Sequence, residues 1–213
     1  MKTYLILLTL LLLSNTQATV IMIDPAGHAK DPGRQLHHNY ERAQTYKCAE
    51  ALRDALEKKP GIKVLITRVL GEEIVPLQNA SFANRMQVDC FIRLHFYKQS
   101  EAKPSLSVYH HVTDPTIDFA KRNIDVLAFR PLDQAHYQNI HASLRMATTV
   151  RQYFQMPSTQ KRLDCHGPFG IPLKPLVGIV APAIVVELGL SNDDQWQDIV
   201  DDLQASICAA CQC

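Results

Sequence analysis

Four polar residues have the side-chain types that a catalytic zinc site needs. They are His28, Glu41, His95 and Glu187. Two imidazoles and one carboxylate form a common ligand set for a catalytic zinc ion, which keeps one further position open for water. Another carboxylate that does not bind the metal can act as the general base. The combination predicts metal-assisted hydrolysis, provided that the fold brings the four side chains together.

Apolar runs predict the strands that would position these residues. The runs cover residues 20–23, 62–67, 90–95, 106–109 and 183–188, and their composition is typical of buried strands. Apolar residues at helical spacing predict helices at 41–59, at 81–86 and from Ser191 to the C-terminus. We expect residues 114–154 to be mostly helical with a break at Pro131, and the segments 26–39 and 164–175 to be loops because they are rich in Gly and Pro.

Strands that alternate with helices predict an α/β fold, with a single open, mostly parallel twisted sheet and helices on both faces. Ligands bind such sheets beyond the carboxyl ends of the strands. His28 follows the first predicted strand, while His95 and Glu187 lie near the ends of two others. Glu41 lies in the first turn of a predicted helix. All four residues therefore belong to one edge of the predicted sheet.

Each of the four also has a simpler explanation. His95 closes an apolar run, where a histidine is often a hydrogen-bonded core residue, and Glu41 near a helix start stabilises the helix dipole. His28 fits an ordinary position in a surface loop. Glu187 is harder to explain in this way, because a carboxylate within an apolar strand is costly to bury without a partner. We therefore predict a charged partner or a functional role for Glu187.

Four segments in order resemble the N-acetylmuramoyl-L-alanine amidases, the family of zinc-dependent AmiC-like catalytic domains. The first is Ile-Asp-Pro-Ala-Gly-His at 23–28, followed by Lys-Asp-Pro-Gly at 30–33, and Glu41 follows thirteen residues after His28. The next contains Ala-Asn at 83–84 and the run 88–95 that ends in His95. The last is Pro-Ala-Ile-Val-Val-Glu-Leu-Gly at 182–189, with Ser-Asn at 191–192. The resemblance extends from residue 20 to the C-terminus.

The resemblance implies a role for each of the four residues. His28, Glu41 and His95 would bind one Zn²⁺ ion, and Glu187 would take a proton from the attacking water and pass it to the leaving amine. The substrate would be peptidoglycan, and the bond would be the amide between N-acetylmuramic acid and the L-alanine that begins the stem peptide. The chain would thus be a cell-wall amidase, a zinc hydrolase.

The sequence departs from the family pattern at three places. Ala26 is an extra residue between Pro25 and Gly27 and lengthens the loop that carries His28. Asn79 stands where the family commonly has an arginine. Bulky or charged residues flank His95, where the family often has small polar ones; they are Arg93, Phe96 and Tyr97. These departures leave the substrate preference open and keep a non-catalytic peptidoglycan-binding protein as an alternative.

A second enzyme hypothesis uses another histidine. His38 and Glu41 have the His-x-x-Glu spacing of zinc carboxypeptidases, and His38 would then replace His28 as a ligand. This spacing is common by chance. The products would be free C-terminal amino acids from cell-wall peptides.

The N-terminus predicts export. Lys2 precedes an apolar run at residues 4–13, and the small residues Thr16 and Ala18 follow. This order is typical of a signal peptide, so we expect residues 1–18 to be removed and residues 19–213 to form one catalytic domain. A buried strand or an uncleaved anchor is the alternative. The predicted location is periplasmic or extracellular, with no stable membrane insertion after cleavage.

Net charge and cysteine content give predictions about binding partners and disulfides. The formal net charge of +1 gives no electrostatic reason to expect binding to nucleic acid or to a membrane surface. Six cysteines in an exported protein predict disulfides, although 15 pairings exist. The cysteines are Cys48, Cys90, Cys165, Cys208, Cys211 and Cys213. A C-terminal tail held by disulfides is a better interpretation than a redox or metal motif at Cys208 and Cys211.

The segment 114–145 suggests regulation. Some cell-division amidases of this family carry an inserted helix that blocks the zinc until a partner removes it. The segment contains Asp133, His136 and His141, which are potential metal ligands. The resemblance therefore implies an activator protein as a partner, whereas a solvated helical connection is the simpler interpretation.

Overall fold

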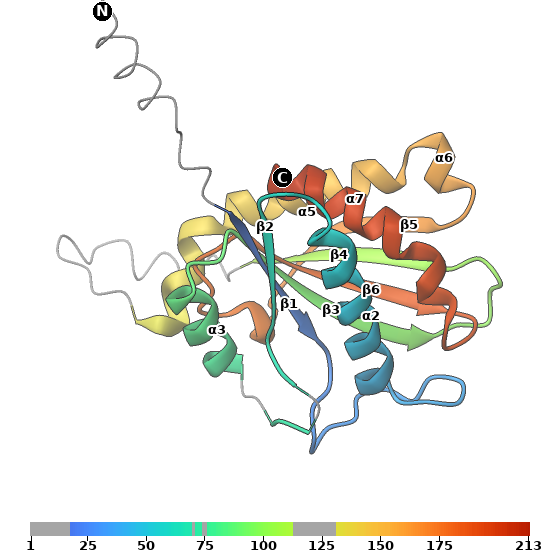
Figure 1. Cartoon of the computed structure of the whole chain (residues 1–213), viewed down its shortest axis with the longest axis horizontal. Helices are drawn as coiled ribbons and strands as arrows, with labels where there is room; N and C mark the ends of the chain where they lie inside the picture. The colour runs from blue at the N-terminus through green and yellow to red at the C-terminus, as the bar shows by residue number, and fades with distance from the viewer. Residues whose placement is uncertain (1–17, 70, 74–75, 113–130) are drawn as a thin grey trace, which may run out of the picture.

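The computed structural model describes residues 18–69, 71–73, 76–112 and 131–213, and within them one six-stranded sheet organises the fold (Figure 1). The strands follow the order β2-β1-β3-β6-β4-β5 across the sheet. They are β1 (Thr19–Pro25), β2 (Ile62–Ile66), β3 (Cys90–Lys98), β4 (Ser105–His111), β5 (Asp164–Ile171) and β6 (Ala183–Leu190). Strands β2, β1, β3 and β6 run parallel, while β4 is antiparallel to β6 and parallel to β5. The predicted α/β fold with a single open, mostly parallel sheet is confirmed.

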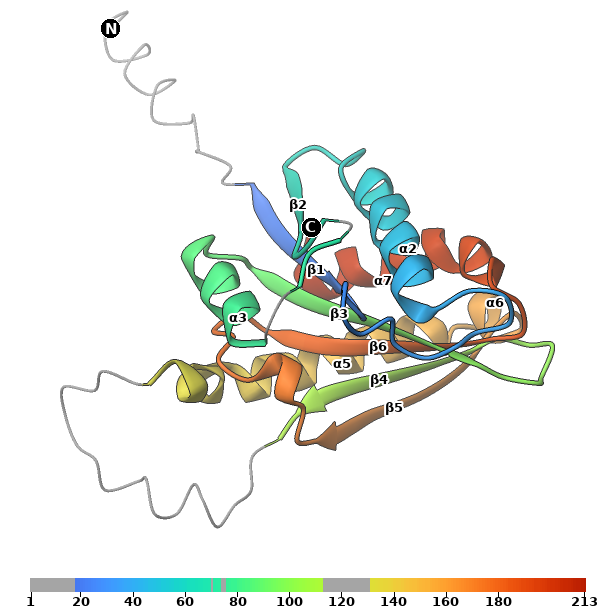
Figure 2. The same cartoon turned by 90° about the horizontal axis from the view of Figure 1, so that it is seen from below.

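Helices cover both faces of the sheet, as predicted. The helices α2 (Glu41–Leu56), α5 (Ile140–Phe154) and α7 (Val200–Cys211) pack on one face, and α3 (Pro76–Arg85) packs on the other (Figures 1 and 2). Short helical segments complete the described chain; they are η1 (Leu132–Asn139), α6 (Pro157–Gln160), η2 (Lys174–Leu176) and η3 (Gln195–Ile199).

Alternation along the strands explains how two cores form. In β1, Ile21 and Ile23 pack against the layer of α2, α5 and α7, whereas Met22 packs against the layer of α3. Neighbouring residues of a strand point to opposite faces, so a strand buried on both sides reads as a continuous apolar run. Helix α2 contributes Ala49, Leu52 and other buried residues at helical spacing.

The structure corrects three boundaries. The segment 164–175 was predicted to be a loop, but its first part forms the edge strand β5, which has no apolar run because most of its residues are partly or fully exposed. The last helix does not begin at Ser191, because a turn and η3 precede α7. Helix α3 begins five residues earlier than the predicted residue 81. The helix predicted within 114–154 is confirmed for α5, while residues 113–130 lie outside the described residues.

Asp193, shortly after β6, anchors the loop that precedes α2. Its carboxylate accepts hydrogen bonds from the backbone N–H groups of His37 at 2.8 Å and His38 at 2.9 Å, and from Asn39 Nδ2 at 2.7 Å. Burial raises the pKa of Asp193, but these donors outweigh it and hold the pKa below its usual value. The anchor fixes the path of this loop over the carboxyl edge of the sheet.

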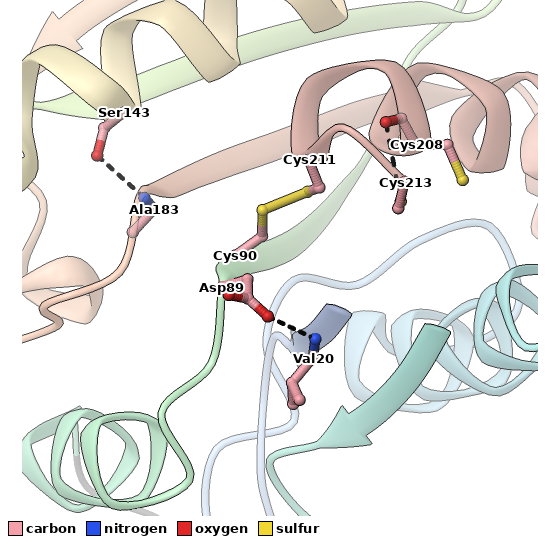
Figure 3. Close-up of a disulfide and its surroundings, with 8 residues drawn as sticks. All are labelled: Val20, Asp89, Cys90, Ser143, Ala183, Cys208, Cys211 and Cys213. Atoms are coloured by element: carbon pink, nitrogen blue, oxygen red, sulfur yellow. Dashed lines mark hydrogen bonds between the residues drawn. A yellow bond between two sulfur atoms is a disulfide. The ribbon is translucent and has the colours of Figure 1, made fainter. Parts of the chain in front are cut away.

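One disulfide connects distant parts of the described chain. Cys90 at the start of β3 is bonded to Cys211 at the end of α7, with 121 residues of sequence separation (Figure 3). A disulfide in the C-terminal tail is therefore confirmed for one pair. The other cysteines are thiols, and burial raises the pKa of Cys48 to about 12, which makes this thiol unreactive.

No helix in the described ranges is long and apolar enough to cross a membrane. The predicted signal peptide lies almost entirely outside these ranges, since the description begins at Ala18.

The disulfide predicts a clear loss of stability when it is removed. A cross-link over a long loop restricts the unfolded chain, so replacing both Cys90 and Cys211 by Ala should lower the free energy of unfolding by about 2–4 kcal/mol. Urea unfolding followed by circular dichroism measures this difference. Cys165→Ala removes a thiol outside the disulfide and is the matched control. An unchanged free energy of unfolding in the double variant would show that the pair does not cross-link the protein.

Candidate active site

The centre of the candidate site is a direct contact between Glu41 and His95. Glu41 Oε1 lies 2.8 Å from His95 Nδ1 and accepts the backbone N–H of Phe96 at 3.0 Å. Glu41 Oε2 accepts the backbone N–H of Arg34 at 3.0 Å. The carboxylate is buried, and only 2% of the residue is exposed. It therefore joins the first turn of α2, strand β3 and the preceding loop.

Gly33 makes this contact sterically feasible. Its φ is +74°, and a Cβ there would lie 2.7 Å from Glu41 Oε2. Any other residue would push the loop away from the carboxylate. Burial raises the pKa of Glu41, but the hydrogen bonds from His95 and from the N–H groups of Arg34 and Phe96 hold it below its usual value. Glu41 is therefore an anion at neutral pH.

The second ring nitrogen of His95 faces Arg93. Arg93 Nε donates a hydrogen bond to His95 Nε2 at 2.8 Å. Because Nε2 accepts this bond, the hydrogen bonding assigns the ring proton to Nδ1, which then donates to Glu41. The imidazole is thus held between a carboxylate and a guanidinium.

Arg93 is in turn held by Asp24 of β1. Arg93 Nη1 forms an ion pair with Asp24 Oδ2, and Asp24 Oδ1 accepts hydrogen bonds from Thr67 Oγ1 at 2.6 Å and Asn79 Nδ2 at 3.1 Å. Asn79 occupies the position where an arginine was expected from the family pattern. The cation that pairs with Asp24 in this chain comes from Arg93 on the neighbouring strand.

Glu187 lies on β6 beside His95. The two residues are register partners in adjacent parallel strands, so their side chains project from the same face of the sheet. Glu187 Oε1 accepts Arg34 Nη1 at 2.5 Å, and Oε2 accepts the Tyr109 hydroxyl at 2.9 Å. The predicted need of Glu187 for a partner is confirmed.

The partners of Glu187 differ in exposure. About half of the Arg34 side chain is exposed, and its guanidinium stacks 5.9 Å from the ring centre of Tyr97. Burial raises the pKa of Tyr109, and its hydrogen bond to Glu187 raises it further. Tyr109 therefore stays a neutral donor that fixes one carboxylate oxygen, while Arg34 is a partner that solvent can reach.

His28 does not join these residues. Its Nδ1 accepts the backbone N–H of Lys30 at 3.3 Å, and its side chain lines a pocket together with Arg93. Ala26 in the same loop is buried, and its N–H bonds to the Leu94 carbonyl at 2.9 Å. In the described ranges, no three His, Cys, Asp or Glu side chains form a cluster that could hold a metal ion.

The other histidines from the sequence hypotheses lie elsewhere. His38 is exposed, and no contact joins its side chain to Glu41. His136 packs edge-on against His111, with ring centres 4.5 Å apart, and its Nδ1 accepts the Gly178 N–H at 3.1 Å. These positions do not support the carboxypeptidase ligand set.

Glu41 and His95 nevertheless fit zinc by the chemistry of their donor atoms. Carboxylate and imidazole are both zinc ligands. The guanidinium of Arg93 places positive charge against the His95 lone pair, where a cation would bind. Zinc at Nε2 would displace Arg93, and zinc at Nδ1 would move the ring proton to Nε2, which could then no longer accept from Arg93. Either mode requires the Arg93–His95 hydrogen bond to break.

Sequence reasoning missed Arg34, Arg93 and Tyr109. A signal for Arg93 exists, because a cation two residues before His95 in an apolar strand must share its face. Arg34 and Tyr109 have their roles because they contact Glu187, which lies far from both in the sequence. The sequence alone does not show such contacts.

The sequence of the chain matches one protein family over most of its length. The family model of N-acetylmuramoyl-L-alanine amidases matches residues 21–211. The comparison with curated protein sequences finds no match.

Solved amidase structures share the fold. The catalytic domain of CwlV, an N-acetylmuramoyl-L-alanine amidase from Bacillus (Paenibacillus) polymyxa var. colistinus, has a TM-score of 0.64 at 19% identity, over 90% of this chain and 95% of that one. The amidase AmiC2 of Nostoc punctiforme has a TM-score of 0.61 at 16% identity, over 93% and 97%. The CwlD amidase from Clostridioides difficile, solved in complex with the GerS lipoprotein, has a TM-score of 0.61 at 13% identity, over 91% and 96%. The TM-scores show the shared fold. The family model covers most of the chain, so the chain belongs to the N-acetylmuramoyl-L-alanine amidase family.

Proposed function

We propose that this protein is a zinc-dependent amidase that hydrolyses the bond between N-acetylmuramic acid and L-alanine in peptidoglycan. The observation that supports this most is the Glu41–His95 contact beside Glu187, at the sheet edge where α/β enzymes bind their ligands. Family membership supplies the substrate class.

Glu41 and His95 would hold the zinc ion, and His28 is proposed as the third ligand. His28 has the least support of the three, since it lines a pocket on the Arg93 side and contacts neither of the others. When bound, zinc supplies Lewis acidity, which lowers the pKa of a water molecule and polarises the scissile carbonyl. The buried backbone donors to Glu41 keep its carboxylate in place throughout.

Glu187 would act as the general base. The Tyr109 hydroxyl orients Oε2, and Oε1 takes the proton of the attacking water once the solvent-accessible Arg34 releases it. The Arg34 side chain is about half exposed, so solvent can take up its charge when the ion pair opens, while Tyr109 still donates to the Glu187 carboxylate. The protonated Glu187 then donates to the nitrogen of the departing L-alanine, which completes the hydrolysis of the amide.

Location and partners follow from the proposed substrate. Peptidoglycan lies outside the cytoplasmic membrane, so we propose export through a signal peptide at residues 1–18, with residues 19–213 as the mature domain. The CwlD structure contains the GerS lipoprotein, and on this basis an activator protein is proposed as a partner here as well.

A non-catalytic peptidoglycan-binding protein is the second candidate. The observation that favours it is that guanidinium groups contact both His95 and Glu187, while His28 lies apart. An amidase releases peptides from peptidoglycan, whereas a non-catalytic binding protein releases none.

Glu187→Gln tests the catalytic proposal. The amide keeps the size of the side chain but cannot accept a proton, so peptide release from purified peptidoglycan should fall by about 10²–10⁴-fold with zinc content unchanged. Mass spectrometry of the released peptides, each beginning with L-alanine, provides the measurement. Glu101→Gln changes an exposed glutamate and should keep full activity. If both the wild type and the Glu187→Gln variant bind zinc but neither releases peptides, the result would favour the non-catalytic peptidoglycan-binding protein.

Arg93→Met tests the competition between guanidinium and metal. Because zinc binding requires loss of the Arg93–His95 hydrogen bond, the variant should bind zinc about tenfold more tightly in a chelator competition assay. Arg34→Met removes the same charge from the site but leaves that hydrogen bond intact, so it isolates the general electrostatic effect. Equal zinc affinities of both variants and the wild type would contradict the competition.

A further inference from the structure

A pocket of about 200 Å³ opens on the Arg93 side of the site. Six of its eight lining residues are polar; they are Asp24, His28, Asp31, Arg68, Asn79 and Arg93. The proposed reaction uses His28 of this wall but assigns no task to Arg68.

Arg68 is a buried cation whose hydrogen bonds in the described chain all go to backbone carbonyls and none to a carboxylate. Only 3% of the residue is exposed, and Nε and Nη2 donate to the carbonyls of Pro25, Ala26 and Arg42 at 3.1–3.3 Å. Its guanidinium also stacks over the ring of Tyr46 at 5.3 Å. Burial lowers the pKa of Arg68 from its usual value, yet a guanidinium stays charged. In the part of the chain that the structure describes, Nη1 has no hydrogen-bond acceptor.

The Asp24 carboxylate interacts with Arg68 only through space. Its hydrogen bonds come from Thr67, Asn79 and Arg93, so Asp24 forms its ion pair with Arg93 and not with Arg68. Arg93 uses Nε and Nη1 for His95 and Asp24, and its Nη2 bonds no described protein group. Two guanidinium groups thus line one pocket, each with a terminal nitrogen that has no protein acceptor.

Asp31 limits the charge that the pocket can accept. It is exposed, lines the rim and accepts the Gly33 N–H at 3.0 Å. The formal charges of Arg68 and Arg93 are balanced by those of Asp24 and Asp31, so the pocket suits a single negative charge held by guanidinium hydrogen bonds better than a phosphate dianion. Planar guanidinium groups also match the geometry of a carboxylate.

We propose that this pocket binds a free carboxylate of the stem peptide, close to the hydrolysed amide bond. The inference rests on the proposed function, because the pocket shares Arg93 with the His95 site. It makes the chain selective for stem peptides whose carboxylate near L-alanine is not amidated.

Calorimetric titration of the mature protein tests this binding without catalysis. The probes are the dipeptides L-alanyl-glutamate and L-alanyl-isoglutamine, which differ only in one carboxylate. The acid should bind at least tenfold more tightly than the amide. Arg68→Met, which keeps an apolar contact with Tyr46, should reduce the ratio to less than twofold. Arg85→Met is the matched control, since Arg85 also stacks on an aromatic ring but is exposed and outside this pocket.

Asp31→Asn supplies an independent test if Arg68→Met fails to fold. The amide oxygen can still accept the Gly33 N–H, but the repulsion of an anion is lost, so the affinity for the acid should rise severalfold while that for the amide stays constant. Equal binding of acid and amide by the wild type, or tighter binding of inorganic phosphate than of the acid, would overturn the proposal. Selective binding of the acid by a protein that releases no peptide would refute the amidase function and leave the carboxylate pocket standing.

Discussion

The buried carboxylate of Glu41 is the interaction on which the site depends. It joins the start of α2 to His95 and to the Phe96 backbone of β3, and it holds the loop before the helix through the Arg34 N–H. A buried anion is stable only when its oxygens are hydrogen-bonded. Removing these donors would release the loop, the imidazole and the helix start together. Gly33 belongs to the same constraint, because its missing Cβ leaves room for the carboxylate.

Positive charge is the second organising feature. Arg93 lies against His95, Arg34 against Glu187, and Arg68 behind the neighbouring pocket. Each guanidinium is placed by a different part of the fold, namely β3, the loop before α2 and the residues after β2. As proposed, these cations would bind an anionic peptide and would at the same time oppose a metal ion at His95. Arg93 would take part in both effects, because it contacts His95 and lines the pocket.

Much of the fold was predictable because buried parallel strands appear in the sequence as apolar runs. β1, β3 and β6 were predicted within a few residues of their bounds. His95 and Glu187 were expected at the ends of their strands, but β3 continues to Lys98 and β6 to Leu190, because the two strands pair with each other beyond these residues. Strand β5 was missed because an exposed edge strand with Gly and Pro has no apolar run to reveal it. Arg34, Arg93 and Tyr109 could not be assigned, since their partners are set by the register of strands far apart in sequence. His28 was grouped with the others from its position after β1, but its side-chain hydrogen bond is to the nearby backbone of Lys30 and not to Glu41, His95 or Glu187.

The most direct test of this account is a crystal structure of the zinc-loaded protein with diffraction data collected at the zinc absorption edge. The account predicts one anomalous peak within bonding distance of Glu41 and His95, with the Arg93 guanidinium displaced from His95 Nε2. The same map would show whether His28 has moved to become the third ligand. A peak only at other residues, or no peak at Glu41 and His95 under saturating zinc, would contradict the claim that this pair forms the metal site.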